Sequence, residues 1–196
     1  IVNAPIEITA LFNGLASLIF FLFPSIVGVS VYRDYKIEMH TILYSYPFSK
    51  TDYLFAKFFS SILTVTAIVL AIGMGMFIGF RLPGTNADIV GTFNAMSYFS
   101  TYGVYILPNI LLFGAIVFAV VTFTRSITAG FMTVIFILLT QGLTVTLLSN
   151  PDGLYLAAIL DPFGATATDY YTKYWTVAER NTSPLPMQGV IIYNRL

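Results

Sequence analysis

Four long stretches of this sequence contain no charged residue, and this restricts the chain to few architectures. The uncharged stretches are residues 8–32, 58–80, 89–124 and 126–151. A helix of about 20 mostly apolar residues crosses the hydrocarbon core of a bilayer. Because a helix satisfies its own backbone hydrogen bonds, we expect each stretch to cross as an α-helix. The alternating pattern of transmembrane barrel strands is absent from the sequence.

The third stretch begins with polar and aromatic residues, so its membrane-spanning part is expected to begin near Tyr102. We predict an all-α, polytopic transmembrane helical bundle with four spans, at residues 8–32, 58–80, 102–124 and 127–149. Composition agrees, since charged residues make up 9% of the chain, whereas an ordinary soluble domain has about a quarter. The zero formal net charge provides no basic field for a nucleic acid partner.

Prolines and glycines modify these predicted helices. Pro24 lies inside the first span and Pro108 near the start of the third, and each is expected to bend its helix. Gly75 and Gly79 form a GxxxG step, which serves either ordinary helix packing or a dedicated dimer contact. The short connection at Arg125 predicts a tight antiparallel hairpin between the last two spans.

Basic residues are denser in the loops on one side of the predicted bundle. Segment 33–57 and the turn at Arg125 are short and rich in Lys and Arg, whereas 81–101 and 150–196 are sparser. The positive-inside rule therefore places 33–57 in the cytoplasm, 81–101 as an outer loop and 150–196 as an outer segment. The chain begins without Met and ends where a new apolar run starts, so we interpret 1–196 as one transmembrane domain that is a fragment.

Segment 33–57 has the pattern of an amphipathic helix followed by a helix start. Apolar and polar residues recur at helical spacing over 33–46, which predicts a helix along the membrane surface. Pro47 is expected to stop it, and Ser49 with Asp52 resembles the N-cap of a helix that enters the second span. The segment is either an interfacial elbow that turns the chain or a docking surface for a cytoplasmic partner.

This segment resembles the cytoplasmic loop of type-2 ABC exporter permeases. The resemblance rests on Arg33-Asp34, Glu38, the run Tyr44–Lys50 and Lys57. In that family the loop forms a coupling helix that lies in a groove of the ATP-binding subunit. The family has six transmembrane helices, of which this chain would hold the second to the fifth.

A second group of residues resembles one subgroup of these permeases. It comprises Leu160-Asp161-Pro162-Phe163-Gly164, Tyr174-Trp175-Thr176 and Asn194-Arg195-Leu196. Members of that subgroup are often fused to, or encoded beside, a zinc aminopeptidase-like domain. There the segment lies outside the membrane and Asn-Arg-Leu leads into the final helix, which is missing here.

The resemblance implies a permease subunit of the bacterial cytoplasmic (inner) membrane that couples ATP hydrolysis by a partner to substrate export. The implied partners are an ATP-binding cassette subunit, a second permease copy in a dimer, the lipid bilayer and a peptidase-like domain. ATP and magnesium would bind the partner subunit, and this chain would hold no cofactor. The partner-binding residues would be Arg33, Asp34, Glu38, Thr41, Ser45, Pro47, Lys50 and Lys57.

Residues for catalysis are missing from the sequence. It has no GxxxxGK[ST] phosphate loop and a single histidine, His40, so nucleotide binding of the Walker type and multi-histidine metal sites are excluded. We therefore do not expect an enzyme, and we interpret Asp161, Asp169 and Glu179 as loop caps and solvated charges. A membrane anchor for a peptidase or other enzyme, and a secondary carrier without ATP, remain alternatives. A carrier would need charges within the spans, which this sequence lacks.

Overall fold

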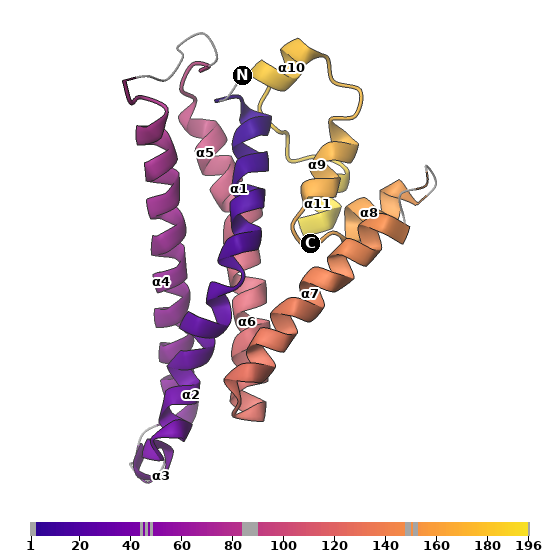
Figure 1. Ribbon diagram of the computed structural model, residues 1–196. Coiled ribbons are helices and arrows are strands. Elements are labelled where there is room, and N and C mark those ends of the chain that lie inside the picture. The colour runs from indigo at the N-terminus through magenta and orange to yellow at the C-terminus, as the bar shows by residue number, and fades with distance from the viewer. Residues whose placement is uncertain are drawn as a thin grey trace. The chain divides into compact units, whose positions relative to one another are not determined.

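The computed structural model describes residues 3–43, 45, 47, 49–83, 90–147, 150 and 153–195. Those residues are mostly helical and none of them lies in a β-strand, which confirms the all-α prediction (Figure 1). The chain divides into two compact units. Unit 1 contains residues 1–16, 73–109 and 139–196, and unit 2 contains 17–72 and 110–138.

Within the described residues, three helices are long and apolar enough to cross a membrane. They are α4 (Lys50–Gly79), the continuous run Ala95–Thr124, and α7 (Ile127–Leu147). A fourth candidate is a pair of helices bent by 44°, Pro5–Ile19 and Pro24–Lys36. The prediction of four spans is met if this bent pair is one span. The second and third spans begin earlier than predicted, because their helices continue through polar residues that flank the apolar runs.

Pro24 causes the break in the first span, as predicted. Helix α1 (Pro5–Ile19) ends before it, and the chain resumes with the π-helical turn η1 (Pro24–Gly28) and α2 (Val29–Lys36). In η1 the Val29 N–H donates to the Pro24 carbonyl, which is the wider π register. Proline has no N–H and crowds the preceding turn, so a regular helix cannot pass through it without disruption.

The third span accommodates Pro108 differently. It consists of α5 (Ala95–Thr101), the π-helical turn η3 (Tyr102–Ile106) and α6 (Leu107–Thr124). In η3 the Leu107 N–H donates to the Tyr102 carbonyl, directly before the proline. The expected disturbance at Pro108 is therefore a wide turn within one continuous span.

Unit 2 packs η1, α2, α4, α6 and α7 around small and β-branched residues. Val27, Val65, Val117, Val121 and Val134 are fully buried. A Cβ added at Gly28 would lie 3.2 Å from Val121, and one added at Gly130 would lie 2.8 Å from the same side chain. The two glycines therefore allow η1 and α7 to approach α6 closely.

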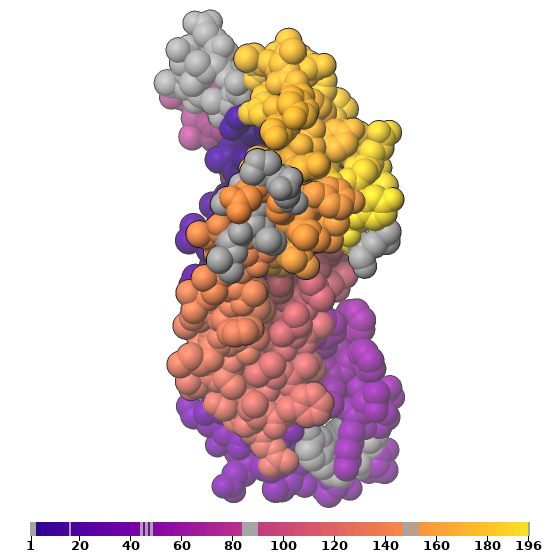
Figure 2. Space-filling model, turned by 90° about the vertical axis from the view of Figure 1, so that its right-hand side faces the viewer, coloured from indigo at the N-terminus to yellow at the C-terminus, as the bar shows by residue number. Residues whose placement is uncertain are grey.

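The other side of α7 is uncovered. Only 11% of an apolar 18-residue stretch of this helix is buried, and large apolar residues such as Met132, Ile135 and Phe136 are exposed. Figure 2 shows this helix, coloured salmon to orange, at the surface. Such an apolar face is expected of a helix whose solvent is lipid.

Unit 1 contains the first part of α1, α5 with η3, and four short helices. These are α8 (Leu154–Leu160), α9 (Ala165–Tyr171), α10 (Val177–Thr182) and α11 (Val190–Arg195). Figure 1 shows α8, α9 and α11 gathered together. Their shared core consists of Tyr105, Ala158, Ala167, Val190 and Ile191.

The GxxxG step in α4 is not a point of close helix approach within the described part of the chain. A Cβ added at Gly75 or Gly79 would meet no heavy atom within 4 Å. By contrast, Gly73 lies against the rings of Tyr102 and Phe12. The close helix contact in this part of α4 is therefore at Gly73, which the sequence motif did not indicate.

Candidate functional site

Residues 33–57, which we call the elbow, connect α2 to α4 within unit 2. Its described part contains the end of α2, the short helix α3 (Met39–Leu43) and the start of α4 (Figure 1). The predicted single helix over 33–46 is corrected to two helices separated at Ile37 and Glu38. Tyr44, Tyr46 and Phe48 of the predicted segment lie outside the described residues.

Glu38 explains why the helix divides. Its φ is 55°, in the left-handed region, and a right-handed helix cannot continue through such a residue. Its N–H donates to the Tyr35 carbonyl at 3.2 Å, and the Ile37 N–H donates to the Arg33 carbonyl at 3.1 Å. These bonds close the C-terminus of α2 in the manner of a left-handed cap. Helical periodicity alone gave no sign of this cap.

The start of α4 follows the prediction from sequence. The Asp52 N–H donates to Ser49 Oγ at 3.3 Å, so Ser49 is the N-cap and Asp52 the third residue of the helix. A carboxylate in the first turn also favours the positive end of the helix dipole. The direction in which the chain leaves the elbow is thus fixed locally.

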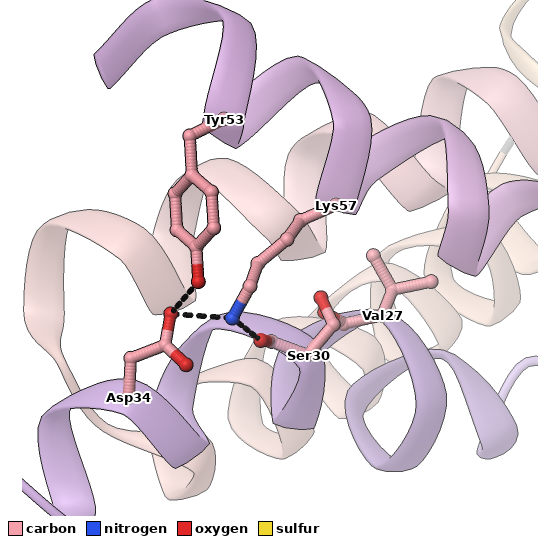
Figure 3. Close-up of polar contacts among 5 residues, drawn as sticks. All are labelled: Val27, Ser30, Asp34, Tyr53 and Lys57. Carbon is pink, nitrogen blue, oxygen red and sulfur yellow. Dashed lines mark hydrogen bonds and ion pairs between the residues drawn. The ribbon is translucent and has the colours of Figure 1, made fainter. Parts of the chain in front are cut away.

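A polar cluster connects α2 to α4 at the two ends of the elbow (Figure 3). Lys57 Nζ forms an ion pair with Asp34 Oδ2 and also donates to the Ser30 carbonyl at 2.6 Å. Tyr53 Oη donates to the same Asp34 oxygen at 2.8 Å. The side chains of Lys57 and Asp34 are only 17% and 10% exposed. We call Ser30, Asp34, Tyr53 and Lys57 the staple.

The staple joins α2 to α4, two helices that α3 separates in sequence. Its charges are mostly removed from water, and their interaction is stronger there than at a surface. Asp34 receives two donors and Lys57 serves two acceptors, which offsets much of the desolvation penalty. Tyr53 and Lys57 stand at i and i+4 on α4, so one face of that helix presents both groups to Asp34.

The remaining predicted partner-binding residues face outward. Asp34 and Lys57 belong to the staple, with Asp34 buried and Lys57 partly buried. The exposed members are Arg33, Glu38, Thr41, Ser45, Pro47 and Lys50. The hydroxyls of Thr41 and Ser45 donate to backbone carbonyls within the elbow, at 2.8 and 2.7 Å. These two hydroxyls therefore stiffen the elbow as well as lining its surface.

Apolar side chains lie on the same exposed surface. Ile37, Met39 and Ile42 are 59%, 45% and 60% exposed. The amphipathic pattern over 33–46 predicts a helix along the membrane surface, whereas the structure exposes these apolar side chains beside polar ones. An apolar centre with a polar and charged rim is the composition of a typical protein interface.

Tyr35 connects the elbow to the turn between α6 and α7. Its ring lies 5.1 Å from the His40 ring and 5.0 Å from the Arg125 guanidinium. Arg125 itself has a φ of 53°, which allows the tight reversal predicted at this position. His40 is thus packed against an aromatic ring and is partly buried.

A second polar cluster, in unit 1, explains the motif Leu160–Gly164. Asp161 accepts the N–H of Phe163 at 2.9 Å and the N–H of Thr166 at 2.7 Å, and so caps α9. Gly164 has a φ of 76°, and a Cβ there would collide with the guanidinium of Arg195. Only glycine fits both conditions without strain.

The motif at Asn194 and Arg195 lies against this same turn. Asn194 Nδ2 is within hydrogen-bond distance of the carbonyls of Ala158, Ile159 and Asp161, at 2.8, 3.0 and 2.7 Å. Arg195 Nη1 donates to Asn109 Oδ1 at 2.8 Å. Two of the three motifs that carry the subgroup resemblance, the one at Asp161 and the one at Asn194, therefore contact each other.

Glu179 is also a cap, as interpreted from sequence. The hydroxyl of Thr176 accepts the Glu179 N–H, and the Glu179 carboxylate accepts the Thr176 N–H at 2.7 Å. These hydrogen bonds to its charged form lower the pKa of the Glu179 carboxyl. No group of three or more His, Asp or Glu residues that could hold a metal ion occurs in the described ranges.

Comparison with known proteins places the chain in a family. A protein-family model described as ABC-2 family transporter protein matches residues 4–162, which include α1 through α8. A search of curated proteins and a search of solved structures each gave no significant match.

Proposed function

This chain belongs to the ABC-2 family of transporter proteins, and we propose that it is the permease subunit of an ATP-binding-cassette exporter. In this proposal ATP hydrolysis takes place on a partner subunit, which also holds the ATP and magnesium. The permease spans the bacterial inner membrane, with the elbow in the cytoplasm and a second permease copy beside it.

The observation that carries this proposal is the construction of the elbow. Its exposed surface combines apolar Ile37, Met39 and Ile42 with charged and polar neighbours. Beneath this surface the staple ties α2 to α4. A partner that pushed on α3 would therefore transmit force to α4 by two routes. One route is the chain that leads to Ser49, the N-cap of α4, and the other is α2 with its Asp34–Lys57 ion pair.

The predicted partner-binding residues then divide into two groups with different tasks. Arg33, Glu38, Thr41, Ser45, Pro47 and Lys50 are proposed to contact the ATP-binding subunit. Asp34 and Lys57 are proposed to keep the elbow rigid, so that closure of the partner moves α4 and does not simply deform the loop. No catalytic step is assigned to this chain.

The test is co-purification of an ATPase with the full-length protein in detergent. Glu38→Arg reverses a charge and Ser45→Arg adds one on the exposed surface of the elbow, where both positions are exposed. The matched control is Lys173→Glu with Gln188→Arg, at exposed positions of unit 1. We expect the elbow variant to lose the ATPase while remaining monodisperse in gel filtration, and the control variant to retain it. Retention of the ATPase by the elbow variant would place the docking surface elsewhere.

A second candidate is an anchor for a zinc aminopeptidase-like domain. It is favoured by the contact between Asn194 and the Asp161 turn, since the corresponding motifs carried the subgroup resemblance. If the full-length protein purifies without an ATPase and with a peptidase domain or subunit, this candidate takes precedence.

A further inference from the structure

An open cavity of about 510 Å³ with a mixed polar and apolar lining adjoins the staple, between η1–α2 and α4. One wall presents Arg33 with the apolar side chains of Ile26 and Val29. The other wall is the α4 face that carries Lys57, Ser60 and Thr64. Its volume lies in the range of small-molecule sites, roughly 300–1,000 Å³. All of these residues belong to unit 2.

The sequence of α4 fixes the depth of this cavity in a membrane. Residues 58–80 contain no charge and lie between Lys57 and Arg81. At a rise of 1.5 Å per residue this interval is about 35 Å long, slightly more than a hydrocarbon core of about 30 Å. Lys57 and the cavity beside it are therefore at one membrane interface, the level at which phospholipid phosphates lie.

The charge of the cavity is positive. Lys57 is balanced by Asp34 within the staple. Arg33 is exposed, and within the described ranges no carboxylate lies within ion-pair distance of its guanidinium. A guanidinium suits a phosphate because its fork of N–H donors matches two phosphate oxygens.

We propose that this cavity binds the phosphate headgroup of an anionic phospholipid. Arg33 pairs with the phosphate, Ser60 lines the polar end, and Ile26 and Val29 contact the upper part of the acyl chains. Basic pockets between transmembrane helices are known sites for anionic headgroups. A bound lipid would also cover the staple from one side and keep water from the Asp34–Lys57 pair. The proposal needs only a membrane around α4, but it shares Arg33 with the proposed docking surface, and the variants below separate the two roles of this residue.

Native mass spectrometry of the full-length protein, purified in detergent and mixed with phosphatidylglycerol or phosphatidylcholine, tests this directly. We compare Arg33→Gln, which removes the charge, with Ser60→Phe, which fills the cavity from α4 and leaves the charge. Arg81→Gln is the control, since this arginine lies at the other end of α4 with its guanidinium 3.7 Å from the Phe77 ring. Gel filtration verifies the fold, and Arg33→Lys provides a milder variant of the same position.

We expect the wild type to retain phosphatidylglycerol over phosphatidylcholine. Arg33→Gln should lower this preference by about five-fold, the effect of one basic residue near an anionic surface. Ser60→Phe should also lower it, because the cavity is filled, while Arg81→Gln and Arg33→Lys keep most of it. Equal retention of the two lipids by the wild type would overturn the proposal. Unchanged preference in both cavity variants would do the same, as would displacement of the lipid by excess inorganic phosphate, which would indicate a site for free anions.

The same preparations separate this proposal from partner docking. If Arg33→Gln loses the lipid preference and keeps the ATPase, the headgroup site stands by itself. If it loses the ATPase and keeps the lipid preference, Arg33 belongs to the docking surface and the headgroup proposal is wrong.

Discussion

The staple makes a quantitative prediction about the stability of the protein. In Lys57→Met the carboxylate of Asp34, which is 10% exposed, keeps only the Tyr53 hydroxyl as a partner. Leaving one member of a buried ion pair uncompensated costs about 3–5 kcal/mol. Because the pair is not completely buried, we expect Lys57→Met to lower the free energy of unfolding by about 3 kcal/mol.

The reverse deletion should be milder. In Asp34→Asn the ammonium of Lys57 keeps the Ser30 carbonyl, and its long stem can move the charge toward water. We expect a loss of about 2 kcal/mol. The double variant removes both charges and should lose about 3 kcal/mol rather than the sum, which gives an interaction energy of about 2 kcal/mol.

The assay is equilibrium unfolding of the full-length protein by SDS in mixed micelles, followed by circular dichroism. Lys36→Met is the matched control, because Lys36 is an exposed cation at the end of α2, the helix that carries Asp34. Its loss should be below about 0.5 kcal/mol, as for ordinary surface charges. Additive losses in the double variant, or a Lys57→Met effect as small as that of the control, would refute the staple as a coupled pair.

Three further outcomes follow from backbone geometry and from the proposed topology. Glu38→Gly should raise the free energy of unfolding by about 1 kcal/mol, because glycine adopts the left-handed conformation freely, and Glu38→Val should lower it. Gly164→Ala should lower the free energy of unfolding by at least about 2 kcal/mol. Gly142→Ala, where an added Cβ would lie in open space, should change it by less than about 1 kcal/mol. Both variants are measured by the same SDS titration. The sequence has no cysteine, so a single Thr41→Cys in intact cells should resist a membrane-impermeant maleimide that labels Thr176→Cys; labelling of Thr41→Cys alone would invert the proposed orientation.

The parts of the fold that local sequence determines were predicted well. The uncharged runs gave the spans, because a charge in hydrocarbon is costly enough to mark each end. Pro24 gave the break in the first span, and Ser49 with Asp52 gave the start of α4. Each of these features depends on residues within a turn or two of each other.

The parts that depend on distant residues were not predictable in this way. The break at Glu38 needs a left-handed backbone that no helical pattern reveals. Asp34 is among the residues that the resemblance implies for partner binding, but its burial is decided by Lys57 and Tyr53 on another helix. The i, i+4 spacing of Tyr53 and Lys57 was a visible signal, but its meaning required knowing that α2 lies beside this face of α4.

The central claim is that the exposed surface of α3 meets an ATP-binding subunit, and site-specific photocrosslinking tests it most directly. A photoreactive phenylalanine analogue is placed at Ile42, which is 60% exposed on the elbow, or at Tyr193, which is 62% exposed in unit 1. The full-length protein is irradiated in membranes, and crosslinked partners are identified by mass spectrometry. We predict an adduct with an ATP-binding-cassette subunit from position 42 and none from position 193. An adduct from position 193 alone, or none from position 42 while the ATPase co-purifies, would contradict the account.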